Sequence, residues 1–535
     1  MEPSRAARSV TVDPPPRLAS RSQSNGAAVS TSHGISRTQM PRRLLIVAWG
    51  LYTATRLPAF FEPHWYTDEA GYAATANAML HGKLLYVGVW NNKPPLHLWT
   101  VAAVLKLFGP SEAAFHSLTY LAGLAALGAA AYAAYHLLPA RRAALATVAV
   151  ALGLGTPVFD AELVVPESLL IAATSWAGAL LLVRLYTRTP GWRWAAVVGL
   201  LAAAATAYQQ TALADACAFL VILVLSPSAR RRQLWAYVAA FVLGSAAWLV
   251  PALAVAGPSR LAYALAGFYV PYTQSMLPRN VAQLGLLVAV GLLAVALALA
   301  SSLILRRSTA SWGLAIWSVA TLLAAAAPQH SYPHLLLPAA VPTLLLAFAI
   351  PLTARTFPRF QLAGLLGLLL AVATAFNLAR VTTVDWIPQL GSGRSLGQYY
   401  GGFLTGITGP SSLAQWQSSF DYRVAPDAAV VGWLTANGRT HSRAVVWSAD
   451  AWVYVLGDLE QVLPTPPIYN DFALLGYHGQ VAVAVAQQQP ALILTTDIDA
   501  HQFPEVQALL DRDYSEVFSS GPEHIWVRRS APPTA

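Results

Sequence analysis

Long apolar runs between residues 44 and 378 constrain the fold of this chain more than any other feature. Each run has roughly 16 to 25 residues, and at about 1.5 Å per residue a helix of that length crosses a hydrocarbon layer of about 30 Å. A helix also satisfies its own backbone hydrogen bonds inside lipid. Only 11% of the 535 residues are charged, well below a soluble domain. The sequence therefore predicts an α-helical polytopic protein of the cell membrane.

The runs also predict a topology. Arginines gather in alternate loops, which by the positive-inside rule face the cytoplasm together with the N-terminus. The other loops collect acids and face outward, as does the chain after residue 378. Segment 94–108 is apolar too, but counting it as a span would invert every later loop, so we expect it flat on the outer surface. We expect about eleven membrane helices, at residues 43–61, 113–138, 143–159, 167–186, 194–209, 211–226, 234–255, 281–305, 310–327, 335–351 and 360–378.

The ends of the chain differ from the membrane part at 41–380. Residues 1–40 are rich in Ser, Pro and Arg with almost no large apolar residues, which predicts a disordered cytoplasmic tail. A Gly- and Ser-rich linker at 381–420 leads to residues 421–535. There, short apolar strands alternate with helix-like runs, which predicts a small extracytoplasmic α/β domain. The strands are expected at 444–447, 491–495 and 524–527, and the helices at 450–456 and 502–511.

Charge and cysteine content exclude two other classes of protein. The net charge is +9, but no basic stripe interleaved with aromatic residues accompanies it, so nucleic acid is not an expected partner. The single cysteine, Cys217, excludes a disulfide framework within the chain. It lies in an apolar run, and we expect it to be buried there.

The first outer loop, residues 62–112, opens with the stretch WYTDEAGY, which contains Asp68 and Glu69. Two interpretations stay open. Acids in the first turn of a helix stabilise it by roughly 0.3 to 1 kcal/mol through the helix dipole. Alternatively, a carboxylate held near lipid at the outer mouth of a bundle is partly desolvated, and its raised pKa suits it to abstract a proton.

Later in the same loop, the stretch WNNKPPLHLW contains Lys93. Asn92 is expected to cap the following helix, with Pro94 or Pro95 in its first turn. A cation is unfavourable at a helix N-terminus, so Lys93 suggests an anion held by the ammonium group and by free backbone N–H groups. Only three of the 33 basic residues are lysines, and all three lie in this region. The alternative is a lysine that extends to the membrane surface.

The stretch HSYPHLLLPAAVP places His330, Tyr332 and His334 at the outer start of the tenth expected span. His334, beside Pro333, is the better candidate for contacting a phosphate. Interfacial His and Tyr are also common without any such role. A divalent cation bound by Asp68, Glu69 and His330 is chemically allowed, but the spacing is not diagnostic, so no cofactor is assigned.

Together, the DE of the first outer loop, the KPPL run and the YPH segment resemble the GT-C membrane glycosyltransferases. The resemblance is to family 39-like enzymes, related to protein O-mannosyltransferases and lipid A aminoarabinose transferases. It implies transfer of one sugar from a polyprenyl-phosphate carrier, with inversion, to a glycolipid, cell-wall glycan or protein acceptor. By this resemblance Asp68 is the base and Glu69 its partner, while Lys93 binds phosphate and Glu167, in VVPESLL, is a second catalytic acid. The remaining candidates for contacting substrate are Tyr72, Asp160, His330, Tyr332 and His334.

A transporter or flippase for lipid-linked sugars is the alternative function. Such a protein would be expected to place ionisable groups within its spans near the midplane. Asp215, five residues into the sixth expected span, is the only acid set inside a span beyond its first residue, and the other acids of the membrane part gather on one face. That distribution favours chemistry at one surface. A noncatalytic scaffold, whose outer domain binds a partner, is a third class that stays open.

Overall fold

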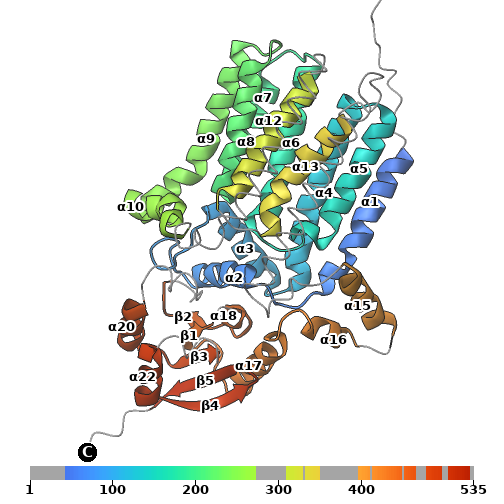
Figure 1. Cartoon of the computed structure of the whole chain (residues 1–535). Helices are drawn as coiled ribbons and strands as arrows, with labels where there is room; N and C mark the ends of the chain where they lie inside the picture. The colour runs from blue at the N-terminus through green and yellow to red at the C-terminus, as the bar shows by residue number, and fades with distance from the viewer. Residues whose placement is uncertain are drawn as a thin grey trace, which may run out of the picture. The chain divides into compact units, whose positions relative to one another are not determined.

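The computed structural model describes residues 42–272, 309–328, 332–349, 396–409, 412–448, 451–464, 478–496 and 504–529. The expected tail at 1–40, the expected spans at 281–305 and 360–378, residues 381–395 of the expected linker, and His330 lie outside these residues. The described chain has a helical bundle and a C-terminal sheet domain (Figure 1).

The bundle helices lie side by side along most of their length (Figure 1). Each begins and ends within a few residues of an expected span, because the apolar runs set the length of each helix. Four described helical stretches are long and apolar enough to cross a membrane: Arg43–Phe61, Glu112–Leu137, Pro166–Tyr186 and Arg231–Ala256. The helices are α1 (Arg42–Arg56, continued by the 3-10 turn η1, Leu57–Phe61), α4 (Glu112–Leu137), α5 (Ala140–Gly155), α6 (Pro166–Tyr186), α7 (Arg193–Tyr208), α8 (Leu213–Leu225), α9 (Arg231–Ala256), α12 (Thr309–Ala326) and α13 (Leu337–Ala349).

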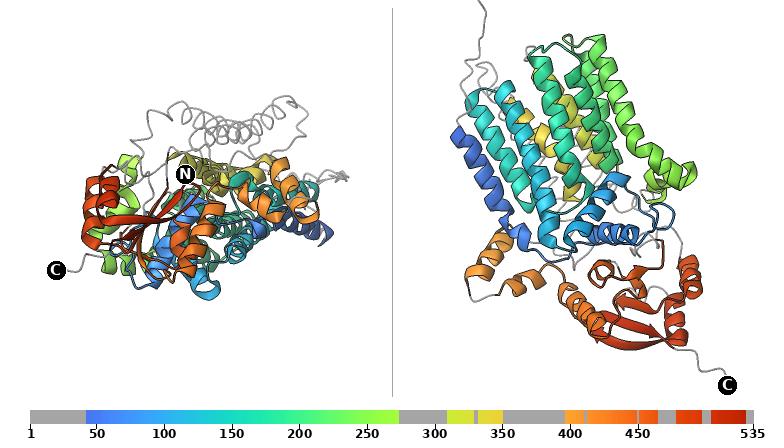
Figure 2. Two further views of the ribbon diagram at one scale, coloured as in Figure 1. Left: turned by 90° about the horizontal axis from the view of Figure 1, so that it is seen from below. Right: turned by 180° about the vertical axis from the view of Figure 1, so that it is seen from behind.

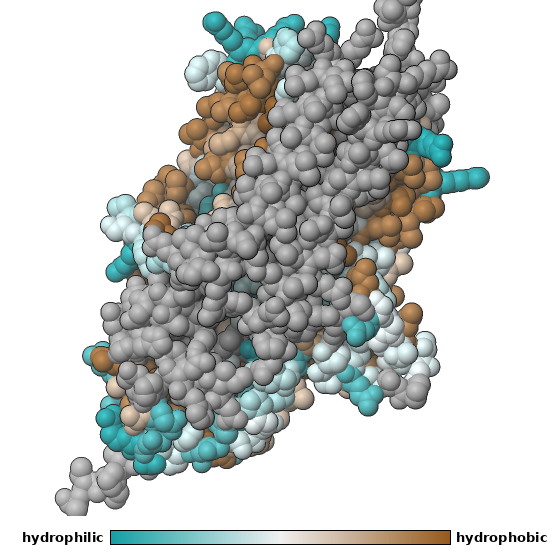
Figure 3. Space-filling model, in the orientation of Figure 1, coloured by the Kyte–Doolittle hydropathy of each residue, from teal (hydrophilic) through white to brown (hydrophobic). Residues whose placement is uncertain are grey.

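Hydrophobic side chains cover the described helices where they are visible in Figure 3, and hydrophilic residues gather at one end of them and over the sheet domain. This is the surface expected of helices in lipid. Cys217 is exposed on α8, so the prediction that it is buried is wrong. An apolar run predicts a membrane helix but does not tell which face of that helix its neighbours cover.

Small residues let the bundle helices approach closely, as is common in membranes. A Cβ atom on Gly199 of α7 would collide with the backbone oxygen of Tyr237 and come within 3.0 Å of the backbone nitrogen of Phe241, both on α9. Gly178 of α6 lies in the same way under the ring of Trp317 on α12. These glycines set the spacing between neighbouring helices.

Two helices of the first outer loop lie at the end of the bundle nearest the sheet domain (Figure 1). Helix α2 (Thr67–Leu80) runs across the ends of the bundle helices, and α3 (Pro95–Phe108) covers most of segment 94–108 (Figures 1 and 2). Helix α2 ends just before His81 and Gly82, and the φ of +88° at Gly82 favours glycine.

The expected cap on α3 is wrong in one respect. Pro94 is the N-cap residue and no side chain caps the helix, so Asn92 does not have that role. Instead the side-chain oxygen of Asn91 accepts a hydrogen bond from the backbone N–H of Lys93, at 3.1 Å. Two adjacent asparagines can fold back in this way, and the sequence did not show which one would.

The C-terminal domain contains a five-stranded sheet with the order β2-β1-β3-β5-β4. Strand β1 is parallel to β2 and β3, whereas β5 is antiparallel to β3 and β4. The three expected strands form β1, β3 and β5. The elements are α15 (Leu396–Thr408), α16 (Leu413–Ser418), α17 (Val424–Ala436), β1 (Arg443–Trp447), α18 (Trp452–Leu456), β2 (Glu460–Gln461), α20 (His478–Gln488), β3 (Leu492–Thr496), α22 (Pro504–Asp513), β4 (Tyr514–Ser520) and β5 (Glu523–Arg528). A mostly helical polytopic fold with a C-terminal mixed sheet is therefore confirmed.

Candidate active site

The candidate active site forms where the expected outer loops meet. Its side chains come from the start of α2, the loop before α3, the loop before α6, the segment after α9 and the turn before α13. We call this set the loop cluster, and it consists of Tyr66, Asp68, Tyr72, Lys93, Asp160, Glu167, Tyr269, Tyr272, Tyr332 and His334. Their mutual effects on pKa values and the contacts given below show that they lie together.

Lys93 is the cation on one side of the loop cluster. Its Nζ lies 5.9 Å from the centre of the Tyr72 ring, a cation–π contact. Burial by itself lowers the pKa of Lys93, but Tyr269 and the negative charges of Glu167 and Asp68 outweigh it, so that the pKa is raised. The ammonium group is therefore retained at neutral pH beside two carboxylates.

His334 is the basic group on the other side. It lies in the 3-10 turn η5 (Pro333–Leu336), before helix α13 begins. Its Nδ1 is 3.4 Å from an Asp160 carboxylate oxygen and 3.5 Å from the Tyr66 hydroxyl, and its ring stacks on Tyr332 with centres 5.4 Å apart. Burial lowers the pKa of His334, but the bond to Asp160 and the nearby carboxylates raise it above its ordinary value.

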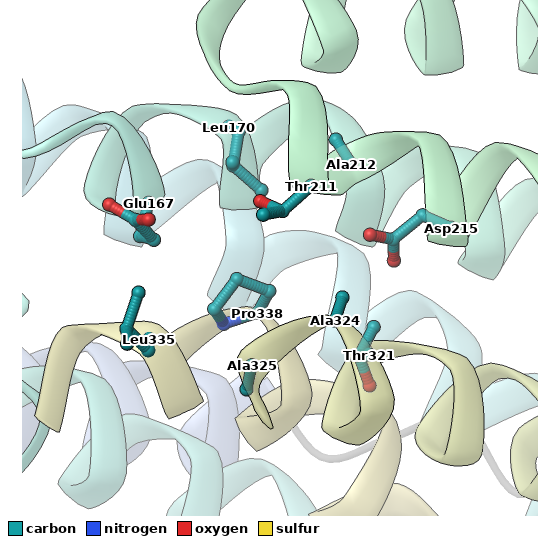
Figure 4. Close-up of a pocket in the computed structure, with 10 residues that line it drawn as sticks. All are labelled: Glu167, Leu170, Thr211, Ala212, Asp215, Thr321, Ala324, Ala325, Leu335 and Pro338. Atoms are coloured by element: carbon teal, nitrogen blue, oxygen red, sulfur yellow. The ribbon is translucent and has the colours of Figure 1, made fainter. Parts of the chain in front are cut away.

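Glu167 lies in the first turn of α6 and is buried on the side of the loop cluster that faces the interior of the bundle. The side-chain amide of Gln209 donates a hydrogen bond to it, at 3.0 Å. Glu167 also lines a narrow cavity among α6, α8, α12 and α13 that has room for about one water molecule. Figure 4 shows Glu167 and Asp215 toward opposite sides of this cavity, with Thr211 between them.

Asp215 is the acid that the sequence places inside a span, and the structure buries it there. One of its carboxylate oxygens accepts a hydrogen bond from the indole N–H of Trp317, at 2.7 Å. That bond links α8 to α12 and partly offsets the cost of burying the carboxylate.

Glu69 points away from the loop cluster. One of its carboxylate oxygens accepts a hydrogen bond from the backbone N–H of Val164, at 2.9 Å. Burial raises the pKa of Glu69 to about 8, against the opposing effect of the Val164 bond and with a further rise from Glu62. Glu112 is also affected by the charge of Glu69, which places Glu69 with a second group of buried acids.

Arg56 is the basic residue beside the second group of buried acids. Its side chain is buried against the loop before α6. Its Nη2 donates hydrogen bonds to the Thr119 hydroxyl, at 2.9 Å, and to the backbone oxygen of Ala161, at 2.8 Å. Its Nη1 forms an ion pair with Glu162, at 3.5 Å.

Comparisons with known proteins bear on this arrangement. Residues 92–257 match a family model described as dolichyl-phosphate-mannose-protein mannosyltransferase. The structure is similar to that of ArnT from Cupriavidus metallidurans in the apo state, with a TM-score of 0.54 and 15% sequence identity, covering 91% of this chain and 97% of that one. The protein has the GT-C fold. The resemblance to family 39-like GT-C proteins is therefore confirmed.

Two further comparisons give the range of similarity to GT-C proteins. ArnT bound to undecaprenyl phosphate matches with a TM-score of 0.51 at 14% identity, over the same shares of the two chains. The archaeal oligosaccharyltransferase AglB from Archaeoglobus fulgidus, in complex with an inhibitory peptide and a dolichol-phosphate, matches at 12% identity and a TM-score of 0.46, covering 92% of this chain and 75% of that one. A search of curated proteins found no match.

Most of the residues singled out in the sequence come together in this GT-C protein. The structure gathers Asp68, Tyr72, Lys93, Asp160, Glu167, Tyr332 and His334, while Glu69 faces the second group of acids and His330 lies outside the described residues. Within the described parts of the chain, Asp68 and Glu69 join no group of three side chains placed to share a metal ion.

Sequence reasoning missed several members of the loop cluster. Tyr269 and Tyr272 follow α9, just after a π-helical turn at Tyr263–Gly267, and such turns are frequent at functional sites. The run FYVPY in an expected outer loop was the available signal. Gln209, the last residue of the fifth expected span, was equally visible as a polar residue on the outer side.

Proposed function

We propose that this GT-C protein is a glycosyltransferase that moves a single sugar from a polyprenyl-phosphate carrier to an acceptor on the non-cytoplasmic face of the membrane. The observation that carries this proposal is the convergence of one carboxylate, Asp68, with two basic groups, Lys93 and His334. The family match and the GT-C fold support it. The acceptor is a glycolipid, a cell-wall glycan or a protein.

Displacement at the anomeric carbon of the sugar needs two kinds of group. Asp68 takes the proton of the acceptor hydroxyl as its oxygen forms the new bond to that carbon, and the bond from the carbon to the carrier phosphate breaks with its electron pair on phosphate. Lys93 and His334 stabilise the negative charge left on the phosphate. One such displacement inverts the configuration at the anomeric carbon.

The other predicted residues position these groups. Asp160 holds His334 and Glu167 lies beside Lys93, and these acids raise the pKa values of both basic groups. Tyr72 and Tyr332 pack against Lys93 and His334 and limit their rotation. No metal ion is assigned to the loop cluster, and transfer assays with and without a chelator test whether a divalent cation takes part.

The orientation follows from the distribution of charge. Arg141, which is exposed, and Arg142, which is half-buried, lie in the first turn of α5 at the end of the bundle opposite α2 and the loop cluster (Figure 1). The positive-inside rule assigns that end to the cytoplasm. The loop cluster and the C-terminal domain then face outward, where polyprenyl chains of the carrier reach the bundle through the lipid.

The decisive experiment is transfer of labelled sugar by the purified protein, over a panel of polyprenyl-phosphate sugars and acceptors. We expect wild-type protein to label one acceptor class and Asp68→Asn to lower the rate by about 10²- to 10⁴-fold. Asparagine keeps the size of the side chain and its ability to accept a hydrogen bond, so a role in helix dipole stabilisation alone predicts little loss. Asp511→Asn, an exposed acid on α22, is the matched control. Full activity of Asp68→Asn would show that Asp68 is not the catalytic base.

The same assay tests the alternative of a transporter or flippase. The observation that favours it is Asp215, a buried acid beside a cavity inside the bundle. In proteoliposomes, a flippase would move labelled carrier lipid between leaflets without forming a glycosylated product. If the wild-type protein moves the carrier lipid but transfers no sugar, and Asp215→Asn no longer moves the lipid, the protein is a transporter and not a transferase.

A further inference from the structure

Three side chains meet far from the loop cluster, where the end of α2 reaches the sheet domain. His81 follows α2, His441 precedes β1, and Asp458 lies between α18 and β2. The Nε2 atom of His81 is 3.3 Å from one carboxylate oxygen of Asp458, and the Nδ1 atom of His441 is 2.9 Å from the other. All three groups offer ligand atoms within 4.8 Å of one another.

The ring of His81 is already oriented to use Nε2. Its Nδ1 atom is 2.9 Å from the backbone oxygen of Asn77, one turn earlier. A carbonyl oxygen only accepts, so Nδ1 carries the proton in this hydrogen bond, and Nε2 is the nitrogen that the neutral ring offers to a metal ion. Metal-binding histidines are commonly held in this way by a second hydrogen bond, which fixes both tautomer and ring direction.

The other two residues are held by their backbones. His441 and Asp458 have φ angles of 62° and 48°, in the left-handed region that His and Asp tolerate better than most residues. The backbone N–H of His441 donates a hydrogen bond to the backbone oxygen of Asp458, at 3.0 Å. The two turns are therefore joined independently of their side chains, and the side chains do not have to be brought together when a ligand binds.

We propose that His81, His441 and Asp458 bind a divalent transition-metal ion, with Zn²⁺ the best match, which ties the end of α2 to the sheet domain. Two imidazoles and one carboxylate suit zinc, whereas calcium and magnesium prefer oxygen ligands alone. Bonds of about 2.0 to 2.1 Å in tetrahedral geometry separate ligand atoms by about 3.3 Å, which is the spacing between His81 and Asp458. The Nδ1 atom of His441 and its Asp458 oxygen, 2.9 Å apart, separate by a few tenths of an ångström when the ion binds.

The role of this ion goes beyond the proposed transfer reaction. Asp68 lies at the first turn of α2, and the metal site follows its last turn. A 14-residue helix is about 21 Å long, so the ion does not touch the reacting groups. Its effect is to fix the position of α2 against the domain, and the fourth coordination position, open on an exposed surface, is filled by water.

The test uses full-length protein without a polyhistidine tag, stripped of metal with a chelator and titrated with Zn²⁺ alone. We expect one equivalent to bind, and Co²⁺ in its place to give the absorption bands of tetrahedral coordination. Zinc should also raise the unfolding temperature, because it binds the folded state. The variants His81→Ala, His441→Ala and Asp458→Asn should each bind zinc more than tenfold more weakly.

His524→Ala is the matched control, since His524 lies 2.8 Å from Glu516 but belongs, among the described residues, to no group of three side chains placed to share a metal ion. It should bind zinc as wild-type protein does. The proposal is overturned if wild-type protein binds no equivalent of zinc, which would leave only hydrogen-bonded ion pairs at this place. It is also overturned if the three variants retain wild-type affinity. None of these measurements depends on sugar transfer, so they stand apart from the test of the enzyme.

Discussion

At the scale of single residues, Asp68 and Glu69 show how neighbours on a helix acquire different roles. The motif DE marked both as acids at the outer rim. Asp68 raises the pKa values of tyrosines and basic groups in the loop cluster. Glu69 instead anchors α2 to the loop before α6 through its hydrogen bond from Val164. We therefore infer that Glu69 assists Asp68 indirectly, by holding α2 in place.

The pKa of Glu69 gives a prediction about stability. In the folded state it is raised to about 8, while in the unfolded chain it returns to its ordinary value near 4.5. Between these pH values the folded state holds a proton that the unfolded state has lost, so raising the pH favours unfolding. We expect the unfolding temperature of wild-type protein, measured relative to that of Glu69→Gln, to fall as pH rises from about 5 to 8. Parallel curves for the two proteins would contradict the raised pKa.

Lys93 gives a prediction about catalysis. Removing one group that stabilises the departing phosphate typically costs about 10²- to 10³-fold in rate, and we expect Lys93→Ala to lower kcat/KM for the donor lipid by this order. Lys93→Arg should recover only part of the activity, because a guanidinium is larger and planar. Lys106→Ala, in the exposed last turn of α3, is the control. Equal activity of Lys93→Ala and Lys106→Ala would show that Lys93 only extends to the membrane surface.

The sequence could predict members of the site but not how they pair. Asp68, Lys93 and Glu167 each belong to a local motif in an expected outer loop or at the outer end of an expected span. The partner of Glu69, Val164, is 95 residues away and contributes only its backbone, so no residue type reveals it. The same holds for Arg56, which finds its partners on α4 and in the loop before α6.

At the scale of elements, the helices were predictable because apolar runs determine where membrane spans begin and end. Their mutual packing was not, since it depends on which small residue faces which neighbour. Gly50 and Gly199 are both helical glycines and look alike in the sequence. The structure separates them, with open space beside Gly50 on α1 and the backbone of α9 beside Gly199.

The contrast between Gly50 and Gly199 predicts that alanine has opposite effects on stability at the two positions. Alanine is intrinsically better than glycine in a helix by about 1 kcal/mol, so Gly50→Ala should leave the unfolding temperature unchanged or raise it. Gly199→Ala must push α7 and α9 apart, and overpacking of this kind typically costs about 1 to 3 kcal/mol. We expect a lower unfolding temperature in detergent for Gly199→Ala alone. A rise in both variants would mean that the two helices are less closely packed.

At the scale of the whole described chain, the sheet domain supports the first outer loop. The side chain of Asn77 donates a hydrogen bond to the backbone oxygen of Tyr454, at 3.3 Å, and the backbone N–H of Trp90 donates one to Pro464, at 2.7 Å. Lys83 donates to the backbone oxygen of Gln461. The sequence predicted the two parts separately, but these contacts use backbone atoms and carry no sequence signature. Strand β4 was missed because most of its residues are exposed and polar.

Trp452 makes the coupling between the two parts testable. It is fully buried on α18, where its ring meets Phe115 at 5.8 Å and His64 at 4.4 Å between ring centres. Replacing a buried Trp by Ala typically costs about 3 to 5 kcal/mol. If α18 holds α2 in place, Trp452→Ala should lower both the unfolding temperature and the rate of sugar transfer. Trp452→Phe, which keeps a ring between Phe115 and His64, should retain most of both. Normal transfer by a destabilised Trp452→Ala, measured below its unfolding temperature, would show that the site is complete without support from the sheet domain.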